Sequence, residues 1–213
     1  MGKLLMPLAI VLVLYFALVG CAPKESMIIS TIPWPDAEET KYTVQDQAGN
    51  TIGNGTLTIA REEESYILKQ DWRIGEVRQT ISIKVADGDL KPISGNQTIV
   101  SPQSEIEINT TYVGNKLKIE LETPEGHKTS ELDVPTDAYD NDEILFLFRA
   151  LPFEQDYQAT YTNTVAATAQ MPKVAITITA KEQVEVPAGL FHCWKLELEV
   201  AGQRQYLWYS MDN

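Results

Sequence analysis

The sequence is poor in cysteine and histidine. Its 213 residues include two cysteines, Cys21 and Cys193, and two histidines, His127 and His192. Protein metal sites usually combine several such side chains, so the chain offers few ligands of these types. Because Cys21 belongs to the leader described below, no disulfide within the chain is expected. We interpret Cys193 as a small core residue, since it lies in the apolar stretch 190–194.

Motifs for covalent catalysis and for phosphate binding are also missing. The chain contains no G-x-S-x-G elbow, and no Lys-Ser/Thr pair follows its glycines between residues 49 and 55. His192 and Cys193 are neighbours, and adjacent residues on a strand point to opposite faces, so they do not form a nucleophile pair. We predict a non-enzymatic protein with no catalytic residues and no cofactor. If the chain were a hydrolase, the titratable groups to examine would be Asp71, Glu182, Glu185 and His192.

Basic residues are few compared with acidic ones. There are 17 Lys and Arg against 30 Asp and Glu, which gives a formal charge of −13. A chain this acidic is repelled by nucleic-acid phosphates and anionic head groups, so we expect no nucleic-acid partner. With 44% hydrophobic and 22% charged residues, the composition is that of a globular protein.

The N-terminus has the three parts of a secretory signal peptide, predicted over residues 1–20. Lys3 provides the positive charge, Leu4–Leu18 is an almost unbroken apolar run, and Gly20 is the small residue before Cys21. The run is short for a membrane span of about 20 residues, which disfavours the alternative of an uncleaved helical anchor. The sequence Leu18-Val19-Gly20-Cys21 resembles the lipobox of bacterial lipoproteins.

This resemblance implies cleavage before Cys21 and lipidation of its thiol. Two or three acyl chains of the palmitate type would anchor the protein stably on the extracytoplasmic side of a membrane, whereas one chain would not. In bacterial lipoproteins, an aspartate directly after the lipidated cysteine resembles a signal for retention in the inner membrane. This chain has Ala22 at that position, so we expect it in the outer membrane if the cell has two membranes. Residues 21–40, with Pro23, Pro33 and Pro35, are interpreted as the lipidated N-terminus and a tether.

Residues 41–213 are predicted to form one mainly β domain. Apolar residues alternate with polar ones in several segments, which is typical of half-buried antiparallel strands. These segments are 81–85, 116–122, 174–178 and 194–200. Turn signals at Gly49, Gly88, Gly114, Gly126 and Gly202 separate the runs. The pattern predicts a curved antiparallel sheet, or a partly open barrel or sandwich.

One segment, residues 141–151, breaks the β pattern. Its residues 144–151 are apolar nearly all round, they follow the largely acidic residues 140–143, and Pro152 comes directly after them. The acidic residues suit a helix N-terminus and the proline ends the helix, so we predict one short buried helix across the open face of the sheet. The wider cluster of Asp133, Asp137, Asp140, Asp142 and Glu143 lacks the spacing of a calcium loop, and we predict no metal there.

Large aromatic residues are the candidates for ligand binding. We expect six of them to line an apolar cavity between the sheet and the helix. The alternative is that the same rings fill a solid core. They are Trp72, Phe146, Phe148, Phe191, Trp194 and Trp208. On the last predicted strand Tyr206 and Trp208 share one face and Tyr209 has the other.

Four segments resemble a bacterial envelope family catalogued as a domain of unknown function. The family pattern E-x-V-x-V/T-P-A-G-x-F/Y-x-C/T is similar to residues 182–193, and its W-Y/L-S strand to residues 208–210. The family's helix is similar to residues 140–152. Its L-x-P-x-S pattern at the start of a strand is similar to residues 90–94. The resemblance spans residues 41–213 and implies no reaction. Members usually continue into a further strand, so we expect an open sheet edge after Asn213.

The sequence therefore favours a lipid-anchored envelope protein that binds an apolar or lipid-like ligand. A looser analogy of fold, to periplasmic lipoprotein carriers that hold acyl chains beneath a helix, points the same way. The second hypothesis is a structural lipoprotein with a solid core and a protein partner, and the third is a hydrolytic enzyme. A cavity lined by aromatic residues would favour the first, and an exposed apolar patch without a cavity the second.

Overall fold

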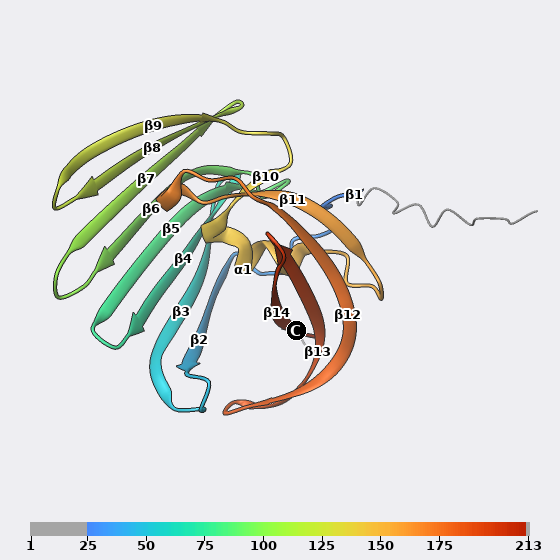
Figure 1. Cartoon of the computed structure of the whole chain (residues 1–213). Helices are drawn as coiled ribbons and strands as arrows, with labels where there is room; N and C mark the ends of the chain where they lie inside the picture. Colours follow the sequence, from blue (N-terminus) through green and yellow to red (C-terminus); the bar gives the residue numbers. More distant parts are fainter. Residues whose placement is uncertain (1–24, 212–213) are drawn as a thin grey trace, which may run out of the picture.

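The protein is built from two β-sheets that enclose a short helix (Figure 1). The computed structural model describes residues 25–211. Strands make up 66% of the structure and helices 7%, and the sheets do not close into a barrel. The predicted fold class, a curved and partly open β structure with one short helix, is confirmed.

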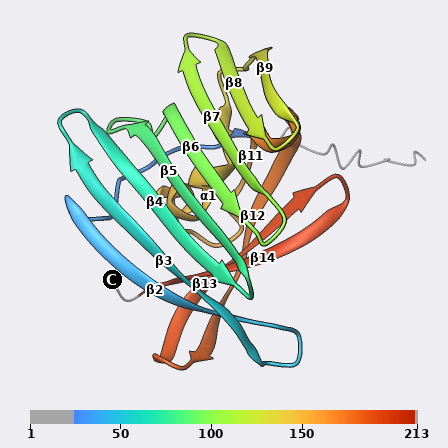
Figure 2. The same ribbon diagram turned by 90° about the vertical axis from the view of Figure 1, so that its left-hand side faces the viewer.

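The larger sheet is an eight-stranded antiparallel meander in which each strand pairs with the next along the chain. Its strands are β2 (Ala37–Gln45), β3 (Thr51–Glu62), β4 (Ser65–Ile74), β5 (Val77–Ala86), β6 (Pro92–Val100), β7 (Glu105–Val113), β8 (Lys116–Thr123) and β9 (Gly126–Asp133). Figure 2 shows how these strands fan out across one side of the molecule. Short turns explain this order, since antiparallel neighbours can be joined by a few residues.

The smaller sheet has six strands and contains two short parallel pairings. Its strands are β1 (Glu25–Ser26), β10 (Ala138–Asp140), β11 (Gln158–Thr164), β12 (Lys173–Val186), β13 (Gly189–Val200) and β14 (Gln203–Ser210). The long strands β11 to β14 pair antiparallel, as predicted, whereas the short strands β1 and β10 run parallel to β11, which was not predicted. The helical segment between β10 and β11 supplies the long crossover that parallel neighbours need.

The alternation seen in the sequence coincides with the two faces of the sheets. In β8, Leu117 and Ile119 are buried while Lys116 and Lys118 are exposed. The apolar residues of 81–85, 174–178 and 196–198 likewise face the interior. Four of the five predicted glycine turns have positive φ. At the fifth, after Gly88, the left-handed residue is the buried Leu90 instead.

The predicted helix at 141–151 is a chain of three short helical pieces. These are the 3-10 turn η1 (Asn141–Glu143), the helix α1 (Ile144–Leu147) and the 3-10 turn η2 (Phe148–Ala150). A capping box starts it: the Asp140 carboxylate accepts from the Asp142 N–H at 3.0 Å, and Glu143 Oε1 accepts from the Asp140 N–H at 2.8 Å. The predicted capping role of the acidic residues is thus confirmed for these two side chains.

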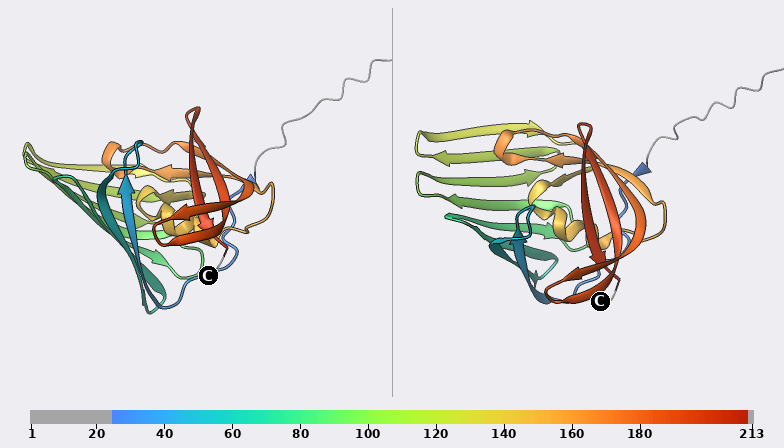
Figure 3. Two further views of the ribbon diagram at one scale, coloured as in Figure 1. Left: turned by 90° about the horizontal axis from the view of Figure 1, so that it is seen from below. Right: turned by 60° about the horizontal axis from the view of Figure 1, so that its bottom comes forward.

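The main core lies where the helical segment meets both sheets. Phe146, Leu147 and Phe148 are fully buried and pack against interior residues of β3, β4, β12 and β13. Both views in Figure 3 show the helix in the space between the sheets. A smaller cluster of Ile108, Leu117 and Ile119 lies under η3 (Ala166–Thr168). Within residues 25–211, no helix is long and apolar enough to cross a membrane.

Part of the segment interpreted as a tether is packed onto the domain. Met27 and Trp34 are buried in the main core, and Ser30 donates from its N–H to the Ala150 carbonyl at 2.9 Å. The proline content indicated a linker. The apolar residues between the prolines instead pack against the domain, whose surface exists only in the folded chain. The predicted signal peptide, the lipobox with Cys21, and Ala22 lie outside the described residues.

Candidate functional site

A cleft of about 410 Å³ opens between the free edges of the two sheets. It lies below α1, with β2 on one side and β14 on the other, as Figure 1 shows for these elements. Its walls combine aromatic and aliphatic side chains with a few polar groups. The lining residues are Glu38, Thr40, Tyr42, Leu57, Trp72, Leu145, Phe146, Arg149, Phe153, Leu207, Trp208, Tyr209 and Ser210.

Trp72 forms one wall, and a glycine makes room for it. The indole ring lies directly over Gly55 of the neighbouring strand, where any Cβ would collide with it. The indole N–H donates to Gln70 Oε1 at 2.8 Å, and Gln70 Nε2 donates to the Asp142 carbonyl at 2.5 Å. These bonds connect the wall to the start of the helical segment, so the ring orientation is fixed before any ligand enters.

Phe153 and Tyr209 form the opposite wall. Their ring centroids are 5.8 Å apart, and Phe153 also stacks on Trp194 at 6.2 Å. The Tyr209 hydroxyl donates to the Leu145 carbonyl at 3.1 Å, and burial raises the pKa of this phenol. The last strand is therefore attached to α1 at the cleft.

An ion pair forms the polar end of the cleft on the β2 side. Arg149 Nη1 and Nη2 donate to the two Glu38 carboxylate oxygens at 2.7 and 3.0 Å. Both side chains are about three-quarters buried, at 22% and 24% exposure. The hydrogen bond from Arg149 lowers the pKa of Glu38, and Thr40 Oγ1 adds a donor to the same carboxylate at 3.2 Å. A bidentate pair of this kind keeps both charges in place near the opening.

Three of the six aromatic residues proposed from the sequence line the cleft: Trp72, Phe146 and Trp208. The remaining three lie elsewhere. Trp194 is one layer behind Phe153, Phe148 is in the core against Tyr161 at 5.7 Å, and Phe191 lies toward the turn between β12 and β13.

Trp208 belongs to the rim more than to the interior. Its indole N–H donates to Glu182 at 2.9 Å, and its ring lies 6.3 Å from Tyr206 on the outer face, as the alternation predicted.

The sequence did not identify four residues of the cleft and its walls, Tyr42, Arg149, Glu38 and Gly55. The only signal for Gly55 was a glycine inside a strand pattern, which marks close approach of another group.

Three carboxyl groups lie at the start of the helical segment, and two of them are buried. Glu143 is fully buried and Asp140 nearly so, and burial raises the pKa of both. Burial, together with the neighbouring Asp140, raises the pKa of Asp142 to about 7. Tyr112 donates from its hydroxyl to Asp140 Oδ2 at 2.6 Å, while Glu143 Oε2 has no hydrogen-bond partner among the described residues.

The two other members of the acidic cluster lie apart from these three. Asp137 pairs with Lys173, and Asp133 pairs with Lys116 at 2.9 Å. In the described part of the chain, no group of three or more His, Cys, Asp or Glu residues is arranged to hold a metal ion.

The side chains to examine for hydrolysis are distributed over both sheets. Asp71 is in β4 and pairs with Arg78 at 2.6 Å, whereas Glu182 is in β12 and pairs with Lys195 at 2.9 Å. His192 is exposed and Cys193 buried, so these neighbours face opposite sides as expected. Glu185 is exposed near the end of β12. These groups do not share a pocket.

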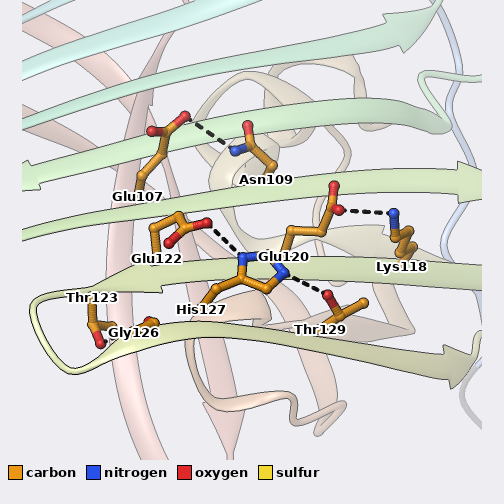
Figure 4. A network of polar contacts seen from close by, with 9 residues as sticks. All are labelled: Glu107, Asn109, Lys118, Glu120, Glu122, Thr123, Gly126, His127 and Thr129. Carbon is orange, nitrogen blue, oxygen red and sulfur yellow. Dashed lines mark hydrogen bonds and ion pairs between the residues drawn. The ribbon is translucent and has the colours of Figure 1, made fainter.

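The outer face of the eight-stranded sheet is polar. Figure 4 shows the exposed His127 between Glu122 and Thr129, with its Nδ1 2.6 Å from Glu122 Oε1 and its Nε2 2.8 Å from Thr129 Oγ1. A trough of about 520 Å³ on the same face is lined mostly by threonine, asparagine and charged residues of β3 to β6. It lacks the aromatic walls of the cleft, which is therefore the better candidate site.

Comparison with known proteins places the domain in a family without an assigned function. The family described as "Protein of unknown function (DUF3108)" matches residues 41–213. Neither the curated proteins nor the solved structures contain a significant match to the chain. The match covers all strands from within β2 to β14, and so includes most of the cleft.

Proposed function

The chain belongs to the DUF3108 family, and we propose that it is a non-enzymatic, lipid-anchored envelope protein that binds an apolar or lipid-like ligand in the cleft between β2, β14 and α1. The observation that carries this proposal is the cleft itself. Its volume of about 410 Å³ lies in the range of ligand pockets, and aromatic and aliphatic side chains dominate its interior.

The distribution of polar groups favours an amphiphile. Glu38, Arg149 and Thr40 lie together at the β2 side, while Phe146, Phe153 and other apolar side chains form the interior. An acyl chain or another apolar body would displace water from the interior, which is the favourable term in such binding. A polar head would remain beside the ion pair, where hydrogen-bonding groups are available.

The leader supports the cellular location in this proposal. A signal peptide followed by a lipobox would place the domain outside the cytoplasm, with acyl chains on Cys21 holding it at the membrane. The domain would then lie close to a source of lipid ligands. The strongly acidic charge agrees with anchoring by lipid, because a surface of that sign does not attract anionic head groups.

Native mass spectrometry of the full chain carrying Cys21→Ser tests the proposal, because this variant cannot be lipidated at position 21. We expect adducts of several hundred daltons (an order-of-magnitude range for lipids of one to two acyl chains) that organic solvent removes and that prove to be lipids on extraction. An apo mass before and after incubation with membrane extract would contradict ligand binding.

Two variants of one strand link the adduct to the cleft. Thr40→Trp fills the cleft from the β2 side, and Thr43→Trp places the same side chain on the opposite, exposed face of β2. We expect the first to lose the adduct and the second to keep it. Equal adducts on both variants would place the ligand elsewhere.

A further inference from the structure

The outer-face trough of β3 to β6 contains more basic than acidic side chains, unlike the chain as a whole. Its charged lining residues are Lys69, Asp71 and Arg73. The carboxylate among them is already bound, because Asp71 accepts from Arg78 at 2.6 Å and lies 3.7 Å from Arg73. Acidic residues outnumber basic ones by 30 to 17 in the whole sequence, so the trough is a local region of positive charge on an acidic protein.

Lys69 is the cation of the trough that remains available to a ligand. Its side chain is exposed, and its ammonium has no hydrogen bond or ion pair with any residue in the range 25–211. The strand register places Thr58 of β3 on one side of it and Ser82 of β5 on the other. Directly opposite residues of antiparallel strands have Cβ atoms about 4.5–5.5 Å apart. One ammonium and two hydroxyl groups thus lie close enough together to donate to a single oxyanion.

The next row of the trough adds further hydroxyl groups. Thr56 and Thr80 stand on either side of Asp71, and within the described part of the chain neither hydroxyl has a hydrogen-bond partner. Figure 4 shows a different situation on β7 to β9 of the same face, where polar side chains bond to one another. The polar groups of the trough therefore have donors and acceptors to offer a ligand, whereas those of β7 to β9 are largely satisfied by their neighbours.

The lining of the trough favours a saccharide over other anionic ligands. Its described lining residues include no aromatic side chain, on which the bases of a single-stranded nucleic acid would stack. Ile81, the one aliphatic residue among them, is buried, so an acyl chain finds no apolar surface. Hydroxyl and amide groups predominate, and sugar hydroxyls can both donate to and accept from such groups.

We propose that the trough binds an acidic polysaccharide. One acidic group of the saccharide accepts from Lys69, Thr58 and Ser82, and sugar hydroxyls bond to Thr56 and Thr80. The volume of about 520 Å³ lies in the range of ligand sites. The envelope location proposed above would bring the domain next to the polysaccharides of the cell surface.

The trough is separate from the cleft proposed for the lipid-like ligand. Successive side chains on a strand point to opposite faces of the sheet. In β4, Trp72 lines the cleft on the inner face, while Asp71 and Arg73 line the trough on the outer face. Neither site requires a ligand in the other, so each of the two binding proposals can fail alone.

Isothermal titration calorimetry on the full chain carrying Cys21→Ser tests the proposal with two acidic polysaccharides, alginate with carboxylates and heparin with sulfates. The uncharged polysaccharide dextran is the reference. We expect at least one of the acidic polysaccharides to bind and dextran not to bind. The affinity should fall as the salt concentration rises, because salt screens exposed charges.

Two pairs of variants locate the bound saccharide. Lys69→Gln should raise the Kd about tenfold, since it removes a charged hydrogen-bond donor. Lys118→Gln removes the same charge from β8 on the same face, where Lys118 bonds to Glu120 at 2.8 Å, and should leave the Kd unchanged. Thr58→Val keeps the shape of the side chain without its hydroxyl, for an expected loss of about threefold. Thr111→Val, at an exposed position of β7 outside the trough, is its control.

Three results would overturn the proposal. The first is a wild type that binds neither alginate nor heparin, and the second is an equal loss of affinity in the Lys69 and Lys118 variants. The third is binding of single-stranded DNA as tight as that of the polysaccharides, since this would show attraction to any polyanion. Lys69→Gln should keep the lipid adduct expected for the cleft, because position 69 lies on the opposite face of the sheet.

Discussion

Replacing the buried Glu143 by glutamine should change the pH dependence of stability in a defined way. Glu143 is fully buried, and burial raises the pKa of its carboxyl well above the ordinary value of 4.5. Its Oε1 accepts the Asp140 N–H at 2.8 Å, a bond that a glutamine oxygen can also accept. The substitution therefore keeps the capping geometry and removes the possibility of ionisation.

The sign follows from proton uptake on folding. Below pH 4.5 the side chain is protonated in both the folded and the unfolded states, so wild type and variant respond alike to pH. Above it, the unfolded chain ionises while the folded chain holds its proton, and the wild type loses about 1.4 kcal/mol of unfolding free energy per pH unit. This loss continues until the pH reaches the folded pKa. Glu143→Gln should lack this loss and become the more stable protein as the pH rises.

Urea unfolding of both proteins at a series of pH values measures the effect. The difference between the two free energies isolates Glu143, because Asp140 and Asp142 titrate in both proteins. Glu154→Gln, an exposed position in the connection that follows the helical segment, is the control and should leave the curve unchanged. A Glu143→Gln curve parallel to the wild type throughout would refute the reasoning, because the carboxyl would then titrate alike in both states.

Three further predictions concern the walls and the core. Gly55→Ala should displace the Trp72 ring and lower the unfolding free energy by about 1–3 kcal/mol, with a change in tryptophan fluorescence. Glu38→Gln should reduce stability by about 1–2 kcal/mol at neutral pH, as measured by urea unfolding. Because Arg149 lowers the Glu38 pKa in the folded state, this difference should shrink as the pH falls through that pKa. Ile176→Ala, at a fully buried position, should lower the unfolding free energy by about 2–5 kcal/mol and the thermal midpoint with it.

Much of the architecture could be predicted from local patterns. Strict alternation in segments such as 116–122 identifies strands and also tells which residues face inward, because side chains on a strand change sides at each residue. The helical segment could be placed to within a residue or two, since Asp140 caps its start and Pro152 follows its end. Large aromatic residues could be identified as a group of candidates, but the sequence did not show which of them line the cleft and which lie in the core.

The sequence by itself determined which segments form strands, where the one helical segment lies and which faces are apolar. Only the tertiary structure decided that β2 and β14 form the two sides of one cleft, because strand edges far apart in sequence are brought together by the curvature of both sheets. It also placed Trp72 over Gly55 and paired Glu38 with Arg149, contacts that depend on the register of strands and the position of α1. Local periodicity carries no information about such long-range pairings, since it repeats identically whichever neighbour a strand adopts.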